Sequence, residues 1–137
     1  MKSSELYEKP FSSVNKTILV LDDELEIVTL IKHLLQRHRY RTFGFTNPLL
    51  AFEHFMLNSK NYSLIISDVR MPAMNGFEFV KKVREIVPPV KVILMSAFDI
   101  NDPVYTRLSS SLKIDGFIQK PFSLKEVIFT IIKQLDK

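Results

Sequence analysis

The sequence predicts an α/β domain built on a parallel sheet with helices on both faces. Five short β-prone apolar runs alternate along the chain with five segments in which apolar residues recur at helical spacing. The runs are almost continuously apolar, as in ILVL at 18–21, which is typical of strands buried on both faces. At 137 residues the chain is long enough for one such domain and too short for two.

The first half of the chain supplies two strand–helix pairs and a third strand. A β-prone run at 17–21 ends in two aspartates, and a helical apolar pattern follows over 24–38. The short aromatic run RTFGF predicts a second strand at 41–45. An Asn-Pro pair then supplies the cap and the first turn of a helix over 48–57. The run YSLIIS predicts the third strand at 62–67.

The second half continues the alternation. A loop leads into a helix over 76–86, and a Pro-Pro break separates that helix from a fourth strand at 90–96. A weaker helical pattern covers 103–112, a short strand covers 116–119, and a closing helix covers 124–135. Such alternation implies right-handed crossovers between parallel strands. The predicted fold is therefore a doubly wound (βα)5 flavodoxin-like sheet with strand order 2-1-3-4-5.

Composition narrows the classes of protein to consider. Residues 1–15 show no periodicity and predict a flexible tail, so the domain is expected to span 16–137. The apolar runs are far shorter than the ~20 residues of a membrane span, and no secretory signal is recognisable. The absence of cysteine fits a reducing, cytoplasmic location. The net charge of +4 is spread over every segment, which argues against a nucleic-acid partner.

Polar side chains follow four of the five predicted strands. Asp22 and Asp23 follow the first strand, Asp68 the third, Ser96 ends the fourth, and Lys120 follows the fifth. In a doubly wound sheet these ends share one edge, where ligands bind. Three carboxylates brought together repel one another unless a cation lies between them, and hard oxygen ligands suit Mg²⁺. The sequence therefore predicts a Mg²⁺-dependent site for phosphoryl chemistry at this edge.

Each of these residues also has an ordinary explanation when it is taken alone. A single aspartate after a strand is most often a helix cap, and a Lys-Pro pair is most often a turn. The tetrapeptide KPFS occurs twice, beginning at Lys9 and at Lys120. Only the second copy follows a predicted strand, so only Lys120 is expected at the site. The four strand ends taken together favour the site over separate ordinary roles.

At this level of detail the sequence resembles the receiver domain of two-component response regulators. The resemblance runs from residue 17 to residue 137 and rests on ILVLDDE, IISDVRMPAMNGFE, VILMSAF and GFIQKPFS. The chain is similar to the single-domain receivers of chemotaxis and of the sporulation phosphorelay. Ser96 stands where threonine is commoner in the family.

The resemblance implies a role for each site residue. Asp68 would be the phospho-acceptor, phosphorylated by a histidine kinase or a phosphotransfer protein. Asp22 and Asp23 would hold Mg²⁺ together with Asp68 and the backbone carbonyl of Arg70. Ser96 and Lys120 would form bonds to the phosphoryl oxygens. Ser96 and Phe117 would be the switch residues, which move on activation.

The resemblance also implies a partner surface. A downstream protein, or a second copy in a phosphorylation-dependent dimer, is expected on the fourth helix, fifth strand and fifth helix, with contacts from Tyr105, Leu108, Phe117 and Gln119.

Arg70 and Phe98, each two residues past a site residue, are expected to border the phosphoryl group and set its lifetime. The chain leaves no room for a DNA-binding output domain, so we expect a stand-alone regulator.

Two other functions compete with this interpretation. One is a Mg²⁺-dependent aspartyl phosphatase, which usually carries a second acid two residues after its nucleophile, where this chain has Arg70. The other is a binding module that works without phosphorylation, which the complete set of site residues disfavours. We therefore expect no enzyme activity beyond the domain's own phosphorylation and dephosphorylation.

Overall fold

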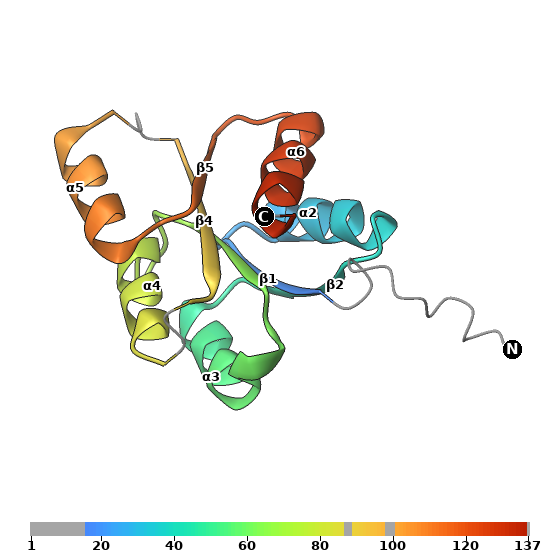
Figure 1. Cartoon of the computed structure of the whole chain (residues 1–137), viewed down its shortest axis with the longest axis horizontal. Helices are drawn as coiled ribbons and strands as arrows, with labels where there is room; N and C mark the ends of the chain where they lie inside the picture. Colours follow the sequence, from blue (N-terminus) through green and yellow to red (C-terminus); the bar gives the residue numbers. More distant parts are fainter. Residues whose placement is uncertain (1–15, 87–88, 98–100, 137) are drawn as a thin grey trace, which may run out of the picture.

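The computed structural model describes residues 16–86, 89–97 and 101–136. Within these residues five parallel strands form one sheet in the order β2-β1-β3-β4-β5, which confirms the predicted topology (Figure 1). The strands are β1 (Thr17–Leu21), β2 (Arg41–Phe45), β3 (Leu64–Asp68), β4 (Lys91–Ser96) and β5 (Gly116–Gln119). The helices are α2 (Leu25–Arg37), α3 (Pro48–Asn58), α4 (Gly76–Arg84), α5 (Pro103–Leu112) and α6 (Leu124–Leu135). The expected tail, 1–15, lies outside the described residues.

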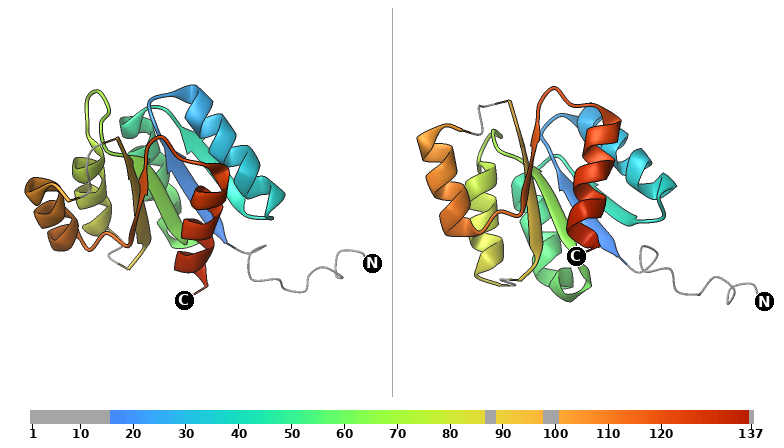
Figure 2. Two further views of the ribbon diagram at one scale, coloured as in Figure 1. Left: turned by 90° about the horizontal axis from the view of Figure 1, so that it is seen from above. Right: turned by 45° about the horizontal axis from the view of Figure 1, so that its top comes forward.

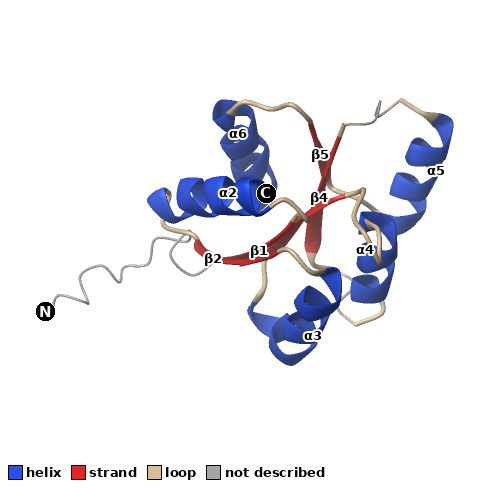
Figure 3. Cartoon of the chain, turned by 180° about the vertical axis from the view of Figure 1, so that it is seen from behind, coloured by secondary structure: helices blue, strands red, loops and turns tan. Residues whose placement is uncertain are grey.

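Helices cover both faces of the sheet. Figures 1 and 3 show α2 and α6 on one face and α3 and α4 on the other, with α5 beside α4. Alternate residues of each strand point to opposite faces, so the chain builds two apolar cores. In β1, for example, Leu19 faces the core under α3 and α4, whereas Ile18 and Val20 face the core under α2 and α6.

Side-chain caps fix where several helices begin. Asn47 accepts hydrogen bonds from the first turn of α3, and Asp102 does the same for α5. Asn75 with Glu78 and Ser123 with Glu126 each form a capping box, at α4 and α6. Ser123 is the serine of the second KPFS copy, so that tetrapeptide ends in the cap of the closing helix.

Two predicted boundaries move by two residues in the structure, and the others move by at most one. The third strand begins at Leu64 rather than at residue 62, because a short 3₁₀ helix, Ser59–Asn61, precedes it. The Tyr62 N–H donates to the Ser59 carbonyl and so is already used by that turn. The helix expected over 76–86 ends at Arg84, and Glu85 and Ile86 form a turn after it.

The topology places the strand ends that matter side by side. β1 lies between β2 and β3, so the chain crosses to opposite sides of β1 and leaves a crevice at this switch point. Figure 2 shows the segments that follow β1, β3 and β5 at the same edge of the sheet. The register places Asp68 opposite Met95, and Ser96 opposite Gln119.

Among the described residues, no helix has the length and apolar character needed to span a lipid bilayer.

Candidate functional site

Three aspartates converge at the carboxyl ends of β1 and β3. Asp22 and Asp23 follow β1, and Asp68 is the last residue of β3. One carboxylate oxygen from each lies within 4.8 Å of the others. The sequence prediction that these three side chains meet is therefore confirmed by the geometry.

Asp22 is the fully buried member of the group. Its Oδ1 accepts a hydrogen bond from the Glu24 N–H at 2.9 Å, and its Oδ2 accepts one from Lys120 Nζ at 2.8 Å. Burial raises the pKa of Asp22, although the lysine and the Glu24 N–H act in the opposite direction. Asp23, by contrast, is exposed and faces the cleft. Asp22 therefore anchors the lysine, and Asp23 presents an open ligand.

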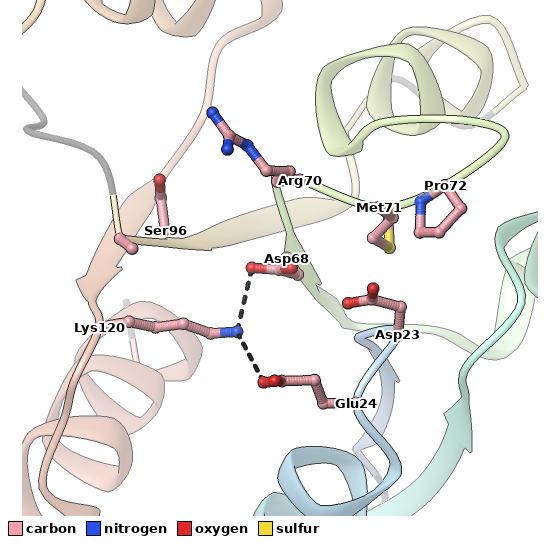
Figure 4. A pocket seen from close by; sticks show the side chains of 9 residues that line it. Asp23, Glu24, Asp68, Arg70, Met71, Pro72, Ser96 and Lys120 are labelled. Atoms are coloured by element: carbon pink, nitrogen blue, oxygen red, sulfur yellow. Dashed lines mark ion pairs between the residues drawn. The ribbon is translucent and has the colours of Figure 1, made fainter.

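Lys120 connects the two strand ends by its ammonium group. Besides Asp22, its Nζ lies 3.2 Å from Asp68 Oδ1 (Figure 4). The Lys120 N–H donates to the Ser96 carbonyl at 2.8 Å, which continues the β4–β5 pairing past the end of β5. Burial alone lowers the pKa of Lys120, but its bonds with Asp22 and Asp68 outweigh burial and raise it. The amine is therefore a fixed cation beside Asp68.

Asp68 is the most perturbed acid of the site. Only 9% of its side chain is exposed, and burial followed by the charge of Asp22 raises its pKa to about 6. The Lys120 ammonium acts in the opposite direction. Near neutral pH the Asp68 carboxyl is thus largely ionised, but its negative charge is buried and poorly solvated.

The structure adds Glu24, which the sequence analysis missed. Its Oε1 lies 3.8 Å from Lys120 Nζ, and its side chain lines the same cleft as Asp23 and Asp68 (Figure 4). The signal was present as the third acid of the run DDE. With four acids and one lysine, the site is more negative than the three aspartates alone implied.

A cleft of about 600 Å³ opens over Asp68. Its walls come from the ends of β1 and β4, from the loop after β3 and from the segment after β5, and its lining includes Arg70, Met71, Pro72, Ser96 and Ala97. Ser96 is 3% exposed at the end of β4. Arg70 is exposed, and its side chain points away from Asp23, on the side of Asp68 where Ser96 lies (Figure 4).

The predicted switch residue Phe117 lies half-buried on β5. Its ring centroid is 5.0 Å from that of Tyr105 on α5, and Tyr105 in turn packs on Phe77 of α4 at 5.3 Å. Tyr105 is only 4% exposed, so the expectation that it contacts a partner is wrong. Its helical spacing with Leu108, Ser109 and Leu112 places it on the inner face of α5. Phe98, expected to border the site, lies outside the described residues.

The donor set fits a hard divalent cation. Three carboxylates lie within reach of one ion, and oxygen ligands of this kind suit Mg²⁺. Lys120 offsets only one of the acidic charges, so a cation in the cleft would relieve the repulsion that raises the pKa of Asp68.

Residues 18–132 match the family model of the response regulator receiver domain. The chain belongs to this family of receiver domains. The response regulator GtcR of Aneurinibacillus migulanus is 33% identical over 122 residues, which are 89% of this chain and 48% of that protein. The sporulation initiation phosphotransferase F of Bacillus subtilis (strain 168) is 28% identical over 122 residues, which are 89% of this chain and 95% of that protein.

A solved receiver confirms the likeness in three dimensions. The response regulator protein TrrA of Thermotoga maritima, in complex with Mg²⁺ and BeF, superposes with a TM-score of 0.73 at 30% identity and covers 88% of this chain and 99% of that one. The receiver domain therefore spans nearly all of the described chain, whereas it is about half of GtcR. The resemblance noted from the four sequence motifs is confirmed.

Proposed function

We propose that this receiver domain accepts a phosphoryl group on Asp68 from the phosphohistidine of a kinase or a phosphotransfer protein. The observation that carries the proposal is the Asp68 carboxylate itself, which lies at the floor of an open cleft, 3.2 Å from the Lys120 ammonium. The wall of that cleft carries the Ser96 side chain. A nucleophile, a fixed cation and a hydroxyl group around one reacting position are the parts that phosphoryl transfer requires.

The transfer exchanges one bond for another. An oxygen of the ionised Asp68 carboxylate attacks the phosphorus, and the bond between phosphorus and the donor imidazole nitrogen breaks with its electron pair remaining on that nitrogen. The products are an acyl phosphate on Asp68 and a donor histidine, whose imidazole is neutral when its other ring nitrogen carries a proton. Since the pKa of Asp68 is about 6, most of the carboxylate is ready to react at neutral pH.

Asp22, Asp23 and Asp68 would hold the Mg²⁺ ion, with the backbone carbonyl of Arg70 as a further ligand. The ion would supply positive charge to the phosphoryl oxygens during transfer. Support comes from the clustered carboxylates and from the Mg²⁺ and BeF complex of TrrA. The Lys120 ammonium offsets negative charge on the phosphoryl oxygens, and the Ser96 hydroxyl donates a hydrogen bond to one of these oxygens.

The phosphorylated domain then signals through a binding face or passes its phosphoryl group on. The likeness to a sporulation phosphotransferase over 95% of its length supports the relay possibility. We place this exchange in the cytoplasm, in keeping with the absence of cysteine. We assign no activity on other substrates, because Arg70 occupies the position where an aspartyl phosphatase would need its second acid. The buried, paired Asp68 equally disfavours a module that never carries phosphate.

The test is an intact-mass measurement after incubation with acetyl phosphate and Mg²⁺. Wild-type protein should gain the mass of one phosphoryl group, and Asp68→Asn should gain none. Asp136→Asn, which alters an exposed aspartate at the end of α6, is the matched control and should behave as wild type. A gain of mass in Asp68→Asn at the wild-type rate would refute the assignment.

A further inference from the structure

A tyrosine on α5 carries a buried hydroxyl next to the site. Tyr105 is 4% exposed, and among the described residues no atom meets the geometry of a hydrogen bond to its Oη. Buried polar groups nearly always have a partner, so an orphaned hydroxyl in this position is unusual. Neither the phosphoryl chemistry nor a docking role of α5 accounts for it.

The hydroxyl lies within electrostatic reach of two site residues. Burial raises the pKa of Tyr105 to about 12, the Asp68 charge acts in the same direction, and an interaction with the Ser96 side chain acts against them. The two hydroxyl groups therefore interact without forming a hydrogen bond that meets strict geometry. A small movement of either group would complete the bond.

The ring of Tyr105 is held between two other aromatic rings. Phe77 of α4 packs against it edge to face, with ring planes at 82°, and Phe117 of β5 packs tilted at 51°. Tyr105 also lies in the first turn of α5, two residues after the Pro103 start. A movement of its hydroxyl would therefore shift that turn and the Phe117 ring together.

We propose that Tyr105 is the residue through which α5 responds to Ser96: when Ser96 donates its proton to a phosphoryl oxygen on Asp68, the Tyr105 hydroxyl donates to Ser96 Oγ. The inference rests on the proposed function, because it needs a phosphoryl group on Asp68. A serine hydroxyl has one donor and two acceptor sites, so it can make both bonds at once. The chain runs from tyrosine to serine to phosphoryl oxygen, and each bond polarises the next.

The arrangement supplies what Phe117 lacks. Phe117 has no polar atom and can respond to the site only through packing. Its neighbour Tyr105, on α5, has a hydroxyl that can bond to Ser96 and a ring that packs on Phe117. Tyr105 can therefore transmit a change at Ser96 to the Phe117 ring. Completing the bond also satisfies a hydroxyl that has no well-formed hydrogen bond to any described residue before phosphorylation, which favours the rearranged state.

The first measurement follows the hydroxyl directly. With ¹³Cζ-labelled tyrosine, the Tyr105 resonance is assigned by its loss in Tyr105→Phe. On phosphorylation with acetyl phosphate and Mg²⁺, this resonance should shift in wild type and stay unshifted in Ser96→Ala, which has no acceptor. An unshifted resonance in fully phosphorylated wild type would overturn the proposal.

The second measurement asks whether α5 depends on the bond. Tyr105→Phe keeps the ring and removes only Oη. Phosphorylation should protect the amides of Val104, Tyr105 and Thr106 from hydrogen exchange, and the variant should lose roughly 2- to 12-fold of that protection, the equivalent of one ordinary hydrogen bond. Tyr40→Phe, another buried tyrosine, is the matched control and should keep the full response. Equal protection in Tyr105→Phe and wild type would overturn the inference.

Two further readouts separate the possible failures. Because no described residue meets hydrogen-bond geometry with the hydroxyl before phosphorylation, Tyr105→Phe should not lower the urea midpoint of the unphosphorylated domain. A lower midpoint would indicate a structural bond and overturn the switch role. Intact mass is recorded on the same samples. If wild type gains no phosphoryl group, the proposed function and this inference both fail, whereas phosphorylated samples with an unchanged α5 refute the inference alone.

Discussion

A Cβ atom on Gly76 would clash with the backbone carbonyl oxygen of Asp68, so only glycine allows α4 to begin this close to the end of β3. The same atom would lie 2.9 Å from Val69 Cα, another backbone atom that cannot turn aside. The Gly76 N–H also donates to the Val69 carbonyl at 2.7 Å. The loop that follows Asp68 is therefore closed by a backbone contact.

Gly76→Ala should destabilise the domain and disturb the acceptor. Overpacking of a close contact costs about 1–3 kcal/mol, and here the displaced atoms belong to the acceptor's own backbone. Urea unfolding gives the loss of stability, and the acetyl phosphate reaction gives the loss of rate. Gly116→Ala is the control, since the atoms nearest its Cβ belong to side chains at ordinary contact distances, the closest being Ile93 at 3.4 Å. Equal losses in both variants would show that the Gly76 contact is not special.

The sequence was sufficient to predict the fold because its signals are local. Buried parallel strands have a continuous apolar pattern, and the cap at Asn47 is a short-range signal, so most element boundaries followed from the sequence. The strand order followed from the alternation of strands and helices. The convergence of Asp22, Asp68 and Lys120 followed from topology alone.

What the sequence analysis missed depends on side-chain packing across elements. Glu24 adjoins the aspartate pair, but only the folded chain shows that it reaches Lys120 at 3.8 Å. Tyr105 was expected on the partner surface of its helix, whereas packing between Phe77 and Phe117 buries it. Residue contacts between distant elements leave little trace in local patterns.

Both aspartates after β1 should be needed for Mg²⁺ binding. Asp22→Asn and Asp23→Asn should each weaken the affinity by at least ~10-fold, which corresponds to ~1.4 kcal/mol, and the double variant should abolish saturable binding. The measurement is an NMR titration of the backbone amides near the site. Asp136→Asn should bind as wild type, and an unchanged affinity in the double variant would remove the metal site from this edge.

Without a divalent cation, the domain should become more stable as pH falls from 7 to 5. The folded pKa of Asp68, about 6, lies above the unfolded value near 3.9, so the native state takes up a proton that the unfolded chain does not. This destabilising contribution, which comes mainly from burial and then from the charge of Asp22, is present above pH 6, is relieved as pH falls through 6, and is gone near pH 4. Urea unfolding in a chelator should show the trend in wild type and a weaker trend in Asp68→Asn; identical trends would contradict the shift.

Arg70 should extend the lifetime of the phosphoryl group. Phosphorylation replaces one charge on Asp68 by two, and the Arg70 side chain extends on the Ser96 side of the acceptor, where it can offset the added charge (Figure 4). For an exposed pair the effect is small, so Arg70→Ala should speed dephosphorylation by roughly 1.5- to 5-fold. Decay of the phosphorylated mass gives the rate, with Arg107→Ala on α5 as control. A wild-type rate in Arg70→Ala would refute the idea.

The last prediction concerns the face from which the signal leaves. A dianion on Asp68 should draw the Ser96 hydroxyl towards it, and Phe117, already half-buried against Tyr105, should turn further inward. Full burial of such a ring is worth ~1.5–3 kcal/mol, so the half-buried ring gains only part of that amount. Hydrogen exchange should therefore change on phosphorylation across α5 and β5, residues 103–119, and remain as before across α2. Ser96→Ala should suppress the change even in the fraction of protein that becomes phosphorylated. A response concentrated in α2, Leu25–Arg37, would instead place the output away from α5 and β5, and would leave the contact between Tyr105 and Phe117 without a role in signalling.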